Sequence, residues 1–346
     1  MVSRQVIVVA CVGMTILMAA DAQADENGIG FWLPGQYGSL AATPQVPGWA
    51  IASIYYHTSV EAGGAVSASR QATIGRFRPD VSIDLAANLN ARVNLGIFVP
   101  SYVFETPVFG GQLALSMVTI VGRNDTNLDG TLTSSIGPLT ATRQGAIDST
   151  VTGFGDLFPK AELRWNSGVH NYLAYAMGGI PVGSYQSTRL ANLGLGHAGV
   201  DGGVGYTYFD QAKGQEFSAV AGLTYNFKNP DTDYRNGVNV HIDWGASQFL
   251  SKQFMIGAVG YFYNQLTDDS GAPAMLGGFR SRVAAVGPQM GFLLPMGEMQ
   301  GYLNFKAYWE FDARNRPEGW NGWVTFAISP RAPATPTAAI RRPWLK

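Results

Sequence analysis

The sequence has little charge, a single cysteine and no excess of basic residues. Charged residues make up 14% of the 346 positions, against about 25% in ordinary soluble domains. Cys11 is the only cysteine, so the chain beyond its N-terminal region has neither disulfides nor thiolate chemistry. The chain has 23 lysines and arginines against 24 acids, and this balance gives no indication of a surface for nucleic acid.

Long apolar runs are also missing after the N-terminus, which excludes a helical membrane span. The first residues, MVSRQ, precede an apolar run of about 15 residues, and Ala22-Gln23-Ala24 then supplies small side chains. This order is typical of a secretory signal peptide. We therefore predict a signal peptide at residues 1–24 and export of the chain, with a retained N-terminal anchor as the less favoured alternative.

The sequence does show an alternation of apolar and polar residues with a period of two. In GVNVHIDWGASQF, residues 237–249, apolar side chains recur at every second position from Val238, with polar or small residues between them. The same alternation runs through residues 81–97, 160–166, 217–227 and 301–311. A helical period fits none of these segments. When segments with less regular alternation are included, we count about 13 strands. Bacterial outer-membrane barrels have an even number of strands, so we expect 12 or 14. Residues 124–153 have room for a further hairpin.

Two kinds of all-β protein have strands with this alternation, a secreted β-sandwich and a transmembrane barrel. The polar face of a soluble sandwich collects lysine and glutamate, whereas here that face carries scattered charge diluted with Asn, Ser and Gly. We therefore predict a transmembrane antiparallel up-and-down β-barrel of about 12–14 strands over residues 48–329, with the apolar face toward lipid. Such a barrel belongs in the outer membrane of a Gram-negative bacterium. Its expected partners are outer-membrane lipid, lipopolysaccharide and the barrel assembly machinery.

Two segments flank the predicted barrel. Residues 25–47 are rich in Gly and Pro and carry the aromatic residues Phe31, Trp32 and Tyr37. This segment either enters the barrel as a plug, with these three side chains as a gate, or runs along the periplasmic rim. Residues 330–346 are rich in Pro and Ala, a composition that predicts a disordered tail.

Several short motifs, in order over most of residues 27–328, resemble one family. They read FWLPGQYG at 31–38, GFGDL at 153–157, YNF at 225–227, QLTDDSG at 265–271 and AVGPQ at 285–289. Together they resemble outer-membrane proteins of the phenol-degradation meta-pathway type, the SphA-like family of outer-membrane transporters. The resemblance implies a transporter associated with aromatic degradation, and it implies no catalytic residues.

The charged residues on the polar parity of the strands are the candidate functional residues. A charge facing acyl chains at the membrane midplane costs about 2–4 kcal/mol, so we expect these side chains to line the lumen and tune selectivity, or to form structural pairs across it. They are Asp84, Arg92, Lys160, Glu162, Arg164, His241, Asp243, Lys306 and Glu310. The predicted function is passive uptake of small hydrophobic or aromatic compounds. The alternative is a structural or adhesive barrel that acts through its outer loops.

The sequence gives weaker indications of an enzyme or a metal-binding protein than of a channel. His241 and Ser247 share the face of one strand with Asp243, but six residues of strand separate two Cα atoms by about 20 Å, so this serine cannot serve this histidine as a nucleophile. Residues 125–130, DTNLDG, match the first half of a calcium loop, but Ile136 occupies the position that needs a bidentate glutamate. We therefore expect no enzymatic activity, no cofactor and no metal site.

Overall fold

The structure, a computed structural model, describes residues 30–71, 80–136, 139–271 and 280–331. The predicted signal peptide at 1–24 lies outside the described residues, as do residues 25–29 of the N-terminal segment and residues 332–346 of the predicted tail.

Twelve antiparallel strands close into a barrel, which confirms the predicted fold and the lower of the two strand numbers. Each strand pairs with its neighbours along the chain, and β1 closes the barrel by pairing with β12. The strands are β1 (Gly48–Gln71), β2 (Asp80–Val103), β3 (Gln112–Ile136), β4 (Leu139–Ser167), β5 (His170–Gly179), β6 (Gly199–Asp210), β7 (Gln215–Asn226), β8 (Asn239–Phe249), β9 (Phe254–Gln265), β10 (Arg282–Met296), β11 (Met299–Arg314) and β12 (Glu318–Pro330). The predicted hairpin within residues 124–153 is formed by β3 and β4. No helix of the described part of the chain has the length and apolarity to cross a membrane.

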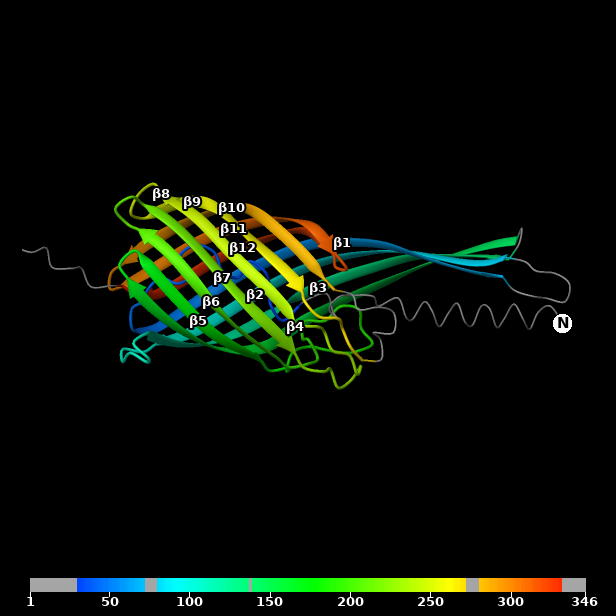
Figure 1. The fold of residues 1–346 in the computed structure, drawn as a ribbon, viewed down its shortest axis with the longest axis horizontal. Coiled ribbons are helices and arrows are strands. Elements are labelled where there is room, and N and C mark those ends of the chain that lie inside the picture. The colour runs from blue at the N-terminus through cyan, green and yellow to red at the C-terminus, as the bar shows by residue number, and fades with distance from the viewer. Residues whose placement is uncertain (1–29, 72–79, 137–138, 272–279, 332–346) are drawn as a thin grey trace, which may run out of the picture.

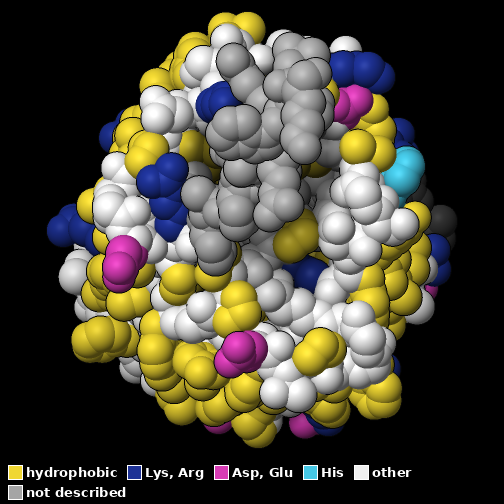
Figure 2. All heavy atoms as spheres, turned by 90° about the vertical axis from the view of Figure 1, so that its left-hand side faces the viewer, with side chains coloured by type: hydrophobic (Ala, Val, Ile, Leu, Met, Phe, Trp, Pro, Cys, Tyr) yellow, Lys and Arg dark blue, Asp and Glu magenta, His cyan; other side chains and the backbone are white. Residues whose placement is uncertain are grey.

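The two rims of the barrel differ in their connections. At one rim, short turns follow β4, β6, β8 and β10, and β1 begins and β12 ends there. At the other rim, longer connections follow β5, β7 and β9. Outer-membrane barrels have short periplasmic turns and longer extracellular loops, so we assign the short-turn rim to the periplasmic side. Viewed from that side, hydrophobic side chains are frequent around the outer margin of the molecule, and a hollow opens near its centre (Figure 2).

The first four strands continue well beyond the rest of the barrel on the long-loop side (Figure 1). Pairing of β1 with β12 stops at Glu61, and the last backbone bonds from β4 to the chain after it are those of Leu157 with Ile180 and of Phe154 with Ser184. Beyond these points the outer parts of β1–β4 form a four-stranded sheet with two open edges, which we call the extension.

The side chains alternate between the two faces of the wall as the sequence predicted in β4, β7, β8 and β11. In β8, Asn239, His241 and Asp243 are buried inside, whereas Ile242 is exposed on the outside. In β2 the side chains also alternate, but the prediction of which set faces the lumen is wrong. Val93 and Leu95 face the interior and are buried. The reason is that the interior itself is apolar along this part of the wall.

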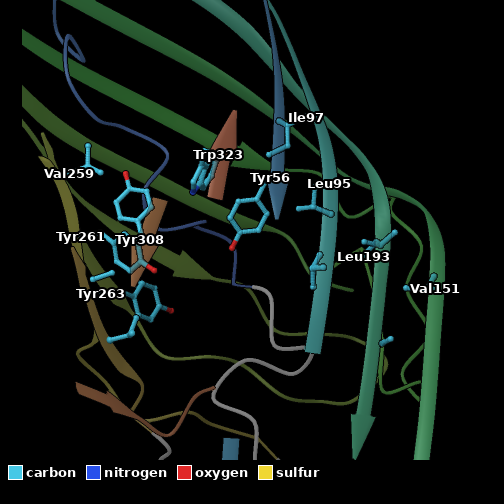
Figure 3. Packing of buried hydrophobic residues seen from close by; sticks show 14 residues of the cluster. Tyr56, Leu95, Ile97, Val151, Leu193, Val259, Tyr261, Tyr263, Tyr308 and Trp323 are labelled. Atoms are coloured by element: carbon cyan, nitrogen blue, oxygen red, sulfur yellow. The ribbon is translucent and has the colours of Figure 1, made fainter. Parts of the chain in front are cut away.

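The interior therefore has an apolar side and a polar side. Side chains from β1, β2, β4, β9, β10, β11 and β12 gather into one apolar cluster, and Leu193 from the β5–β6 loop joins it (Figure 3). Its labelled members are Tyr56, Leu95, Ile97, Val151, Leu193, Val259, Tyr261, Tyr263, Tyr308 and Trp323. The polar side is built mainly by β4, β6, β7 and β8, whose inward residues include most of the buried charges.

Candidate functional site

Residues 30–47, the lumenal segment, run through the inside of the barrel. Their backbone and side chains bond to inward-facing residues of seven strands, β3, β4, β6, β7, β8, β10 and β11. Phe31 and Trp32 are 4% and 3% exposed, so they are enclosed by the wall. The segment joins β1 at Gly48, and its covalent link to the wall thus lies at the periplasmic rim.

A tight turn at Pro34–Tyr37 is held between opposite charges. The backbone N–H groups of Gly35 and Tyr37 donate to the two carboxylate oxygens of Asp243, at 2.9 and 3.1 Å. From the other side the Lys306 ammonium donates to the carbonyl oxygens of Gly35 at 2.6 Å and Gln36 at 3.2 Å. Both partner side chains are buried. We call Asp243 and Lys306 together the clamp. Their bonds give hydrogen-bond partners to the backbone of the turn and also to both buried charges.

Glycine is required within this turn. Gly35 has φ of +89°, a conformation that side-chain-bearing residues rarely adopt, and an added Cβ would lie 3.0 Å from the ring of Tyr308. The Tyr308 hydroxyl also donates to the Gly35 carbonyl, at 3.3 Å. The Pro-Gly pair of the FWLPGQYG motif thus fits the turn that the clamp holds.

A second charged group lies on β4. Glu162 accepts from Lys160 Nζ at 3.0 Å on one oxygen and from Arg164 Nη2 at 3.1 Å on the other. The Tyr37 hydroxyl donates to the same carboxylate at 2.7 Å. Arg164 also donates to the side chain of Gln45, so this group holds the lumenal segment at two points.

A third group lies behind Trp32. Its ring stacks on the imidazole of His241 with centroids 3.7 Å apart. His241 Nε2 lies 2.9 Å from Asp201 Oδ2, and the same carboxylate accepts from the hydroxyls of Tyr175 and Thr224. The imidazole is fully buried, which makes it a support for Trp32 rather than a group in contact with solvent.

The remainder of the segment is held by uncharged and acidic side chains of the wall. Ser39 Oγ lies 2.7 Å from Ser247 Oγ, and Gln289 donates to both hydroxyls. The Leu40 backbone N–H donates to Glu216 at 2.8 Å. The contacts thus continue along the segment toward the periplasmic rim.

The β5–β6 loop also folds inward, and Asp156 holds it there. Its two carboxylate oxygens accept from the backbone N–H groups of Gly183 and Leu195, each at 2.8 Å. Asp156 lies in the GFGDL motif of β4 and is 2% exposed. Leu193 and Leu195 of this loop thereby become part of the lumen wall.

Two cavities remain between the lumenal segment and the β1–β4 wall. The larger has a volume of about 190 Å³ and is lined by apolar side chains from β1 to β5, together with Tyr37 and Lys160. The smaller has a volume of about 80 Å³ and lies along the part of β1 and β2 nearer the extension. Gly30 and Leu33 line both cavities, so the segment separates them.

The structure brings most of the predicted residues into this arrangement. Phe31, Trp32 and Tyr37 lie in the lumen, and seven of the predicted charged residues point inward. Those seven are Lys160, Glu162, Arg164, His241, Asp243, Lys306 and Glu310. Glu310 lies apart from the clamp, where it accepts from the Tyr261 hydroxyl at 2.7 Å and from the Gly319 N–H.

Asp84 and Arg92 do not line the lumen, and their predicted position is wrong. Both are exposed. Arg92 pairs in register with Ser59, which pairs with the exposed Trp320. A charge at such an interfacial level costs about 0–1 kcal/mol rather than 2–4 kcal/mol at the midplane, so it need not point inward. Asp84 lies farther out, in the extension.

Several important residues did not stand out in the sequence. Asp201 lies in a run interrupted by Gly202, Gly203 and Gly205, which have no side chains to show the alternation. Glu216 lies just before a segment with clear alternation and shares the polar parity of Ser218, so that parity is a signal that identifies it.

The positions of the side chains do not support the hypotheses of a catalytic site at His241 or a calcium loop at residues 125–130. His241 has an acid partner in Asp201, but Ser247 bonds to Ser39 and Gln289 instead. Among the described residues no serine hydroxyl bonds to this histidine. Residues 125–130 lie within β3, where Asp125 accepts a bidentate pair of bonds from Arg123.

The architecture is similar to that of a solved outer-membrane barrel. The COG4313 outer membrane channel from Pseudomonas putida F1 has 15% sequence identity and a TM-score of 0.58, over 86% of this chain and 98% of that chain. A FadL homologue from Pseudomonas aeruginosa aligns over 88% of this chain and 95% of that chain, with 9% identity and a TM-score of 0.33. No curated protein sequence matches the chain.

A family model matches residues 57–326, which is more than half of the sequence and nearly the whole barrel. The motifs at 153–157, 225–227, 265–271 and 285–289 all lie within the matched region. The chain is thus an outer-membrane β-barrel that belongs to the family described as "Putative MetA-pathway of phenol degradation".

Proposed function

We propose that the protein is an outer-membrane channel for passive uptake of small hydrophobic or aromatic compounds, and that the lumenal segment is its gate. The observation that carries this proposal is a segment outside the strand ladders, held in the lumen by polar contacts, beside an apolar cavity. Backbone bonds of the segment to wall side chains can be replaced by bonds to water when it moves, so opening breaks no strand ladder.

The two cavities supply the path. They lie in succession along the β1–β3 wall, with Gly30 and Leu33 at the boundary of both. Movement of the segment toward the periplasm joins them, and the apolar lining of the larger cavity favours an apolar solute over water and ions.

Locking the gate tests this function. In S39C/S247C the two sulfur atoms replace hydroxyl oxygens that lie 2.7 Å apart, a spacing from which a disulfide can form. We expect oxidation to lower the flux of radiolabelled benzyl alcohol into vesicles with lipopolysaccharide in the outer leaflet. The fall is expected to be about tenfold or more, because a minor open state carries the flux. A reductant should restore it.

The single variants S39C and S247C are the matched controls, because neither can form the cross-link. The only native cysteine, Cys11, lies in the predicted signal peptide. Flux through the reduced protein that equals flux into protein-free vesicles contradicts the channel. Flux through the oxidised protein that equals flux through the reduced protein contradicts the gate.

The extension favours a second candidate function, a structural or adhesive role. Its edges beyond Glu61 and before Phe154 have no neighbouring strand in the barrel ladders, and open edges offer backbone groups to a strand of another molecule. The side chains of residues 140–148 on the β4 edge are exposed. This candidate places the partner site outside the lumen.

Shortening the extension separates the two candidates. Gly63 pairs with Asn88, and Gly130 with Gly145, so Asn-Gly turns joined at these pairs shorten both hairpins in register. If the protein is a channel, benzyl alcohol flux is expected to stay within about twofold of the unshortened protein, since surface changes remote from the lumen have small effects. Loss of cell or surface attachment with unchanged flux assigns adhesion to the extension.

A further inference from the structure

The larger cavity has the size and lining of a site for one aromatic ring. Its volume is about 190 Å³, whereas an apolar cavity of about 150 Å³ is sufficient to bind benzene. Ala52, Ile54, Val118 and Met177 are among its apolar wall residues, and the rings of Phe31, Phe158 and Trp323 add flat aromatic surface. The smaller cavity, at about 80 Å³, is too small for a ring.

One charged side chain, Lys160, lies among the described residues that line the larger cavity. Its ammonium is 3.0 Å from Glu162 and 3.5 Å from the Tyr37 hydroxyl. Glu162 also accepts from Arg164 at 3.1 Å. Two cations thus share one carboxylate, and the group carries one excess positive charge at the wall of an apolar cavity.

That excess charge is available to a solute. The Lys160 side chain is 17% exposed, and a lysine ammonium has three N–H donors. Because water is scarce beside apolar walls, an anion that reaches this ammonium gains more than it does in bulk water. The cavity therefore combines an apolar body with a single cationic contact at its edge.

We infer that this cavity binds a one-ring aromatic monocarboxylate, with the ring among the apolar side chains and the carboxylate on Lys160. The inference rests on the proposed channel function and names its substrate class. Tyr37, which bonds to Glu162 in the same group, also lines the cavity. The bound solute therefore contacts the lumenal segment directly, next to the group that holds it.

Binding to the purified full-length barrel in detergent tests the inference without any transport step. Isothermal titration with benzoate, benzyl alcohol and toluene compares the same ring with and without the anionic group. We expect benzoate to bind the wild-type protein about tenfold or more tightly than benzyl alcohol, the factor of one charge-assisted hydrogen bond. In K160M that preference should disappear, because the carboxylate of benzoate loses its cationic partner.

Three variants serve as controls. K160R keeps the charge and should retain the preference for benzoate, and K252M removes an exposed lysine of the β8–β9 turn and should have no effect. A52F places a ring inside the cavity and should abolish binding of all three probes. Each variant is used only if it shows the heat-dependent electrophoretic shift of a folded barrel, so that misfolding is not mistaken for loss of the site.

The outcomes are distinct from those of the flux assay. Equal affinity for benzoate and benzyl alcohol in the wild-type protein overturns the inference, as does an undiminished preference in K160M or unchanged binding in A52F. Flux of benzyl alcohol without benzoate preference leaves the channel proposal standing and removes this substrate class. Benzoate binding without any flux removes the channel and retains the site.

Discussion

Deletion of residues 30–44 is expected to raise the flux of small solutes through the barrel by about tenfold or more, because a closed segment leaves only a minor open state. The deletion removes the turn held by Asp243 and Lys306 and the buried aromatic residues Phe31 and Trp32. It leaves every strand ladder intact, since β1 begins at Gly48. Single-channel conductance in planar bilayers and vesicle swelling in small sugars measure the change.

A second variant separates the contacts of the segment from its bulk. Replacement of residues 30–44 by a Gly/Ser linker of equal length keeps the chain in place but removes the side chains and the Pro-Gly turn. A flexible linker of this kind has no preferred conformation to hold in the lumen. It should conduct nearly as well as the deletion. Conductance of the deletion variant equal to that of the wild-type protein shows instead that the wall side chains close the lumen without the segment.

The strands of the barrel were predictable because the membrane imposes a period of two on them. In β8 the period places His241 and Asp243 inside and Ile242 outside, and a polar interior facing an apolar membrane makes the two faces easy to distinguish. The same period in β2 gave the wrong orientation, because Val93 and Leu95 face an interior that is itself apolar. Alternation shows that a strand has two different faces. It shows which face points to the lumen only where the lumen and the membrane differ in polarity.

The path of the lumenal segment was not predictable from local sequence. Gly35 and Asp243 are separated by 208 residues, and Ser39 and Gln289 by 250. No periodicity within residues 25–47 indicates such partners, so a plug in the lumen and a course along the periplasmic rim fitted the sequence equally well. The FWLPGQYG motif marked the segment as distinctive, and the clamp explains why Gly35 in particular is needed there.

Replacement of Lys306 by methionine is expected to release the lumenal segment. The variant K306M loses the charge-assisted bonds to the carbonyl oxygens of Gly35 and Gln36. It also leaves Asp243 buried without a nearby lysine. Loss of one such bond costs about 1.5–3 kcal/mol, which corresponds to about a tenfold to hundredfold rise in the population of the released state.

Labelling of a cysteine at position 39 measures the release directly. Ser39 bonds to the wall in the lumen, so S39C should react slowly with a membrane-impermeant maleimide in the wild-type background and faster when K306M is added. The control K252M removes an exposed lysine at the periplasmic rim and should leave the labelling rate unchanged.

A double-mutant cycle shows whether the two charges act as one clamp. Because Asp243 and Lys306 hold the same turn from opposite sides, D243N and K306M should each accelerate labelling, and the double variant should accelerate it by less than the product of the two factors. Additive free energies would show that the charges hold the segment independently. An unchanged labelling rate in K306M would mean that the bonds of Tyr37 and Leu40 are sufficient to hold the gate closed.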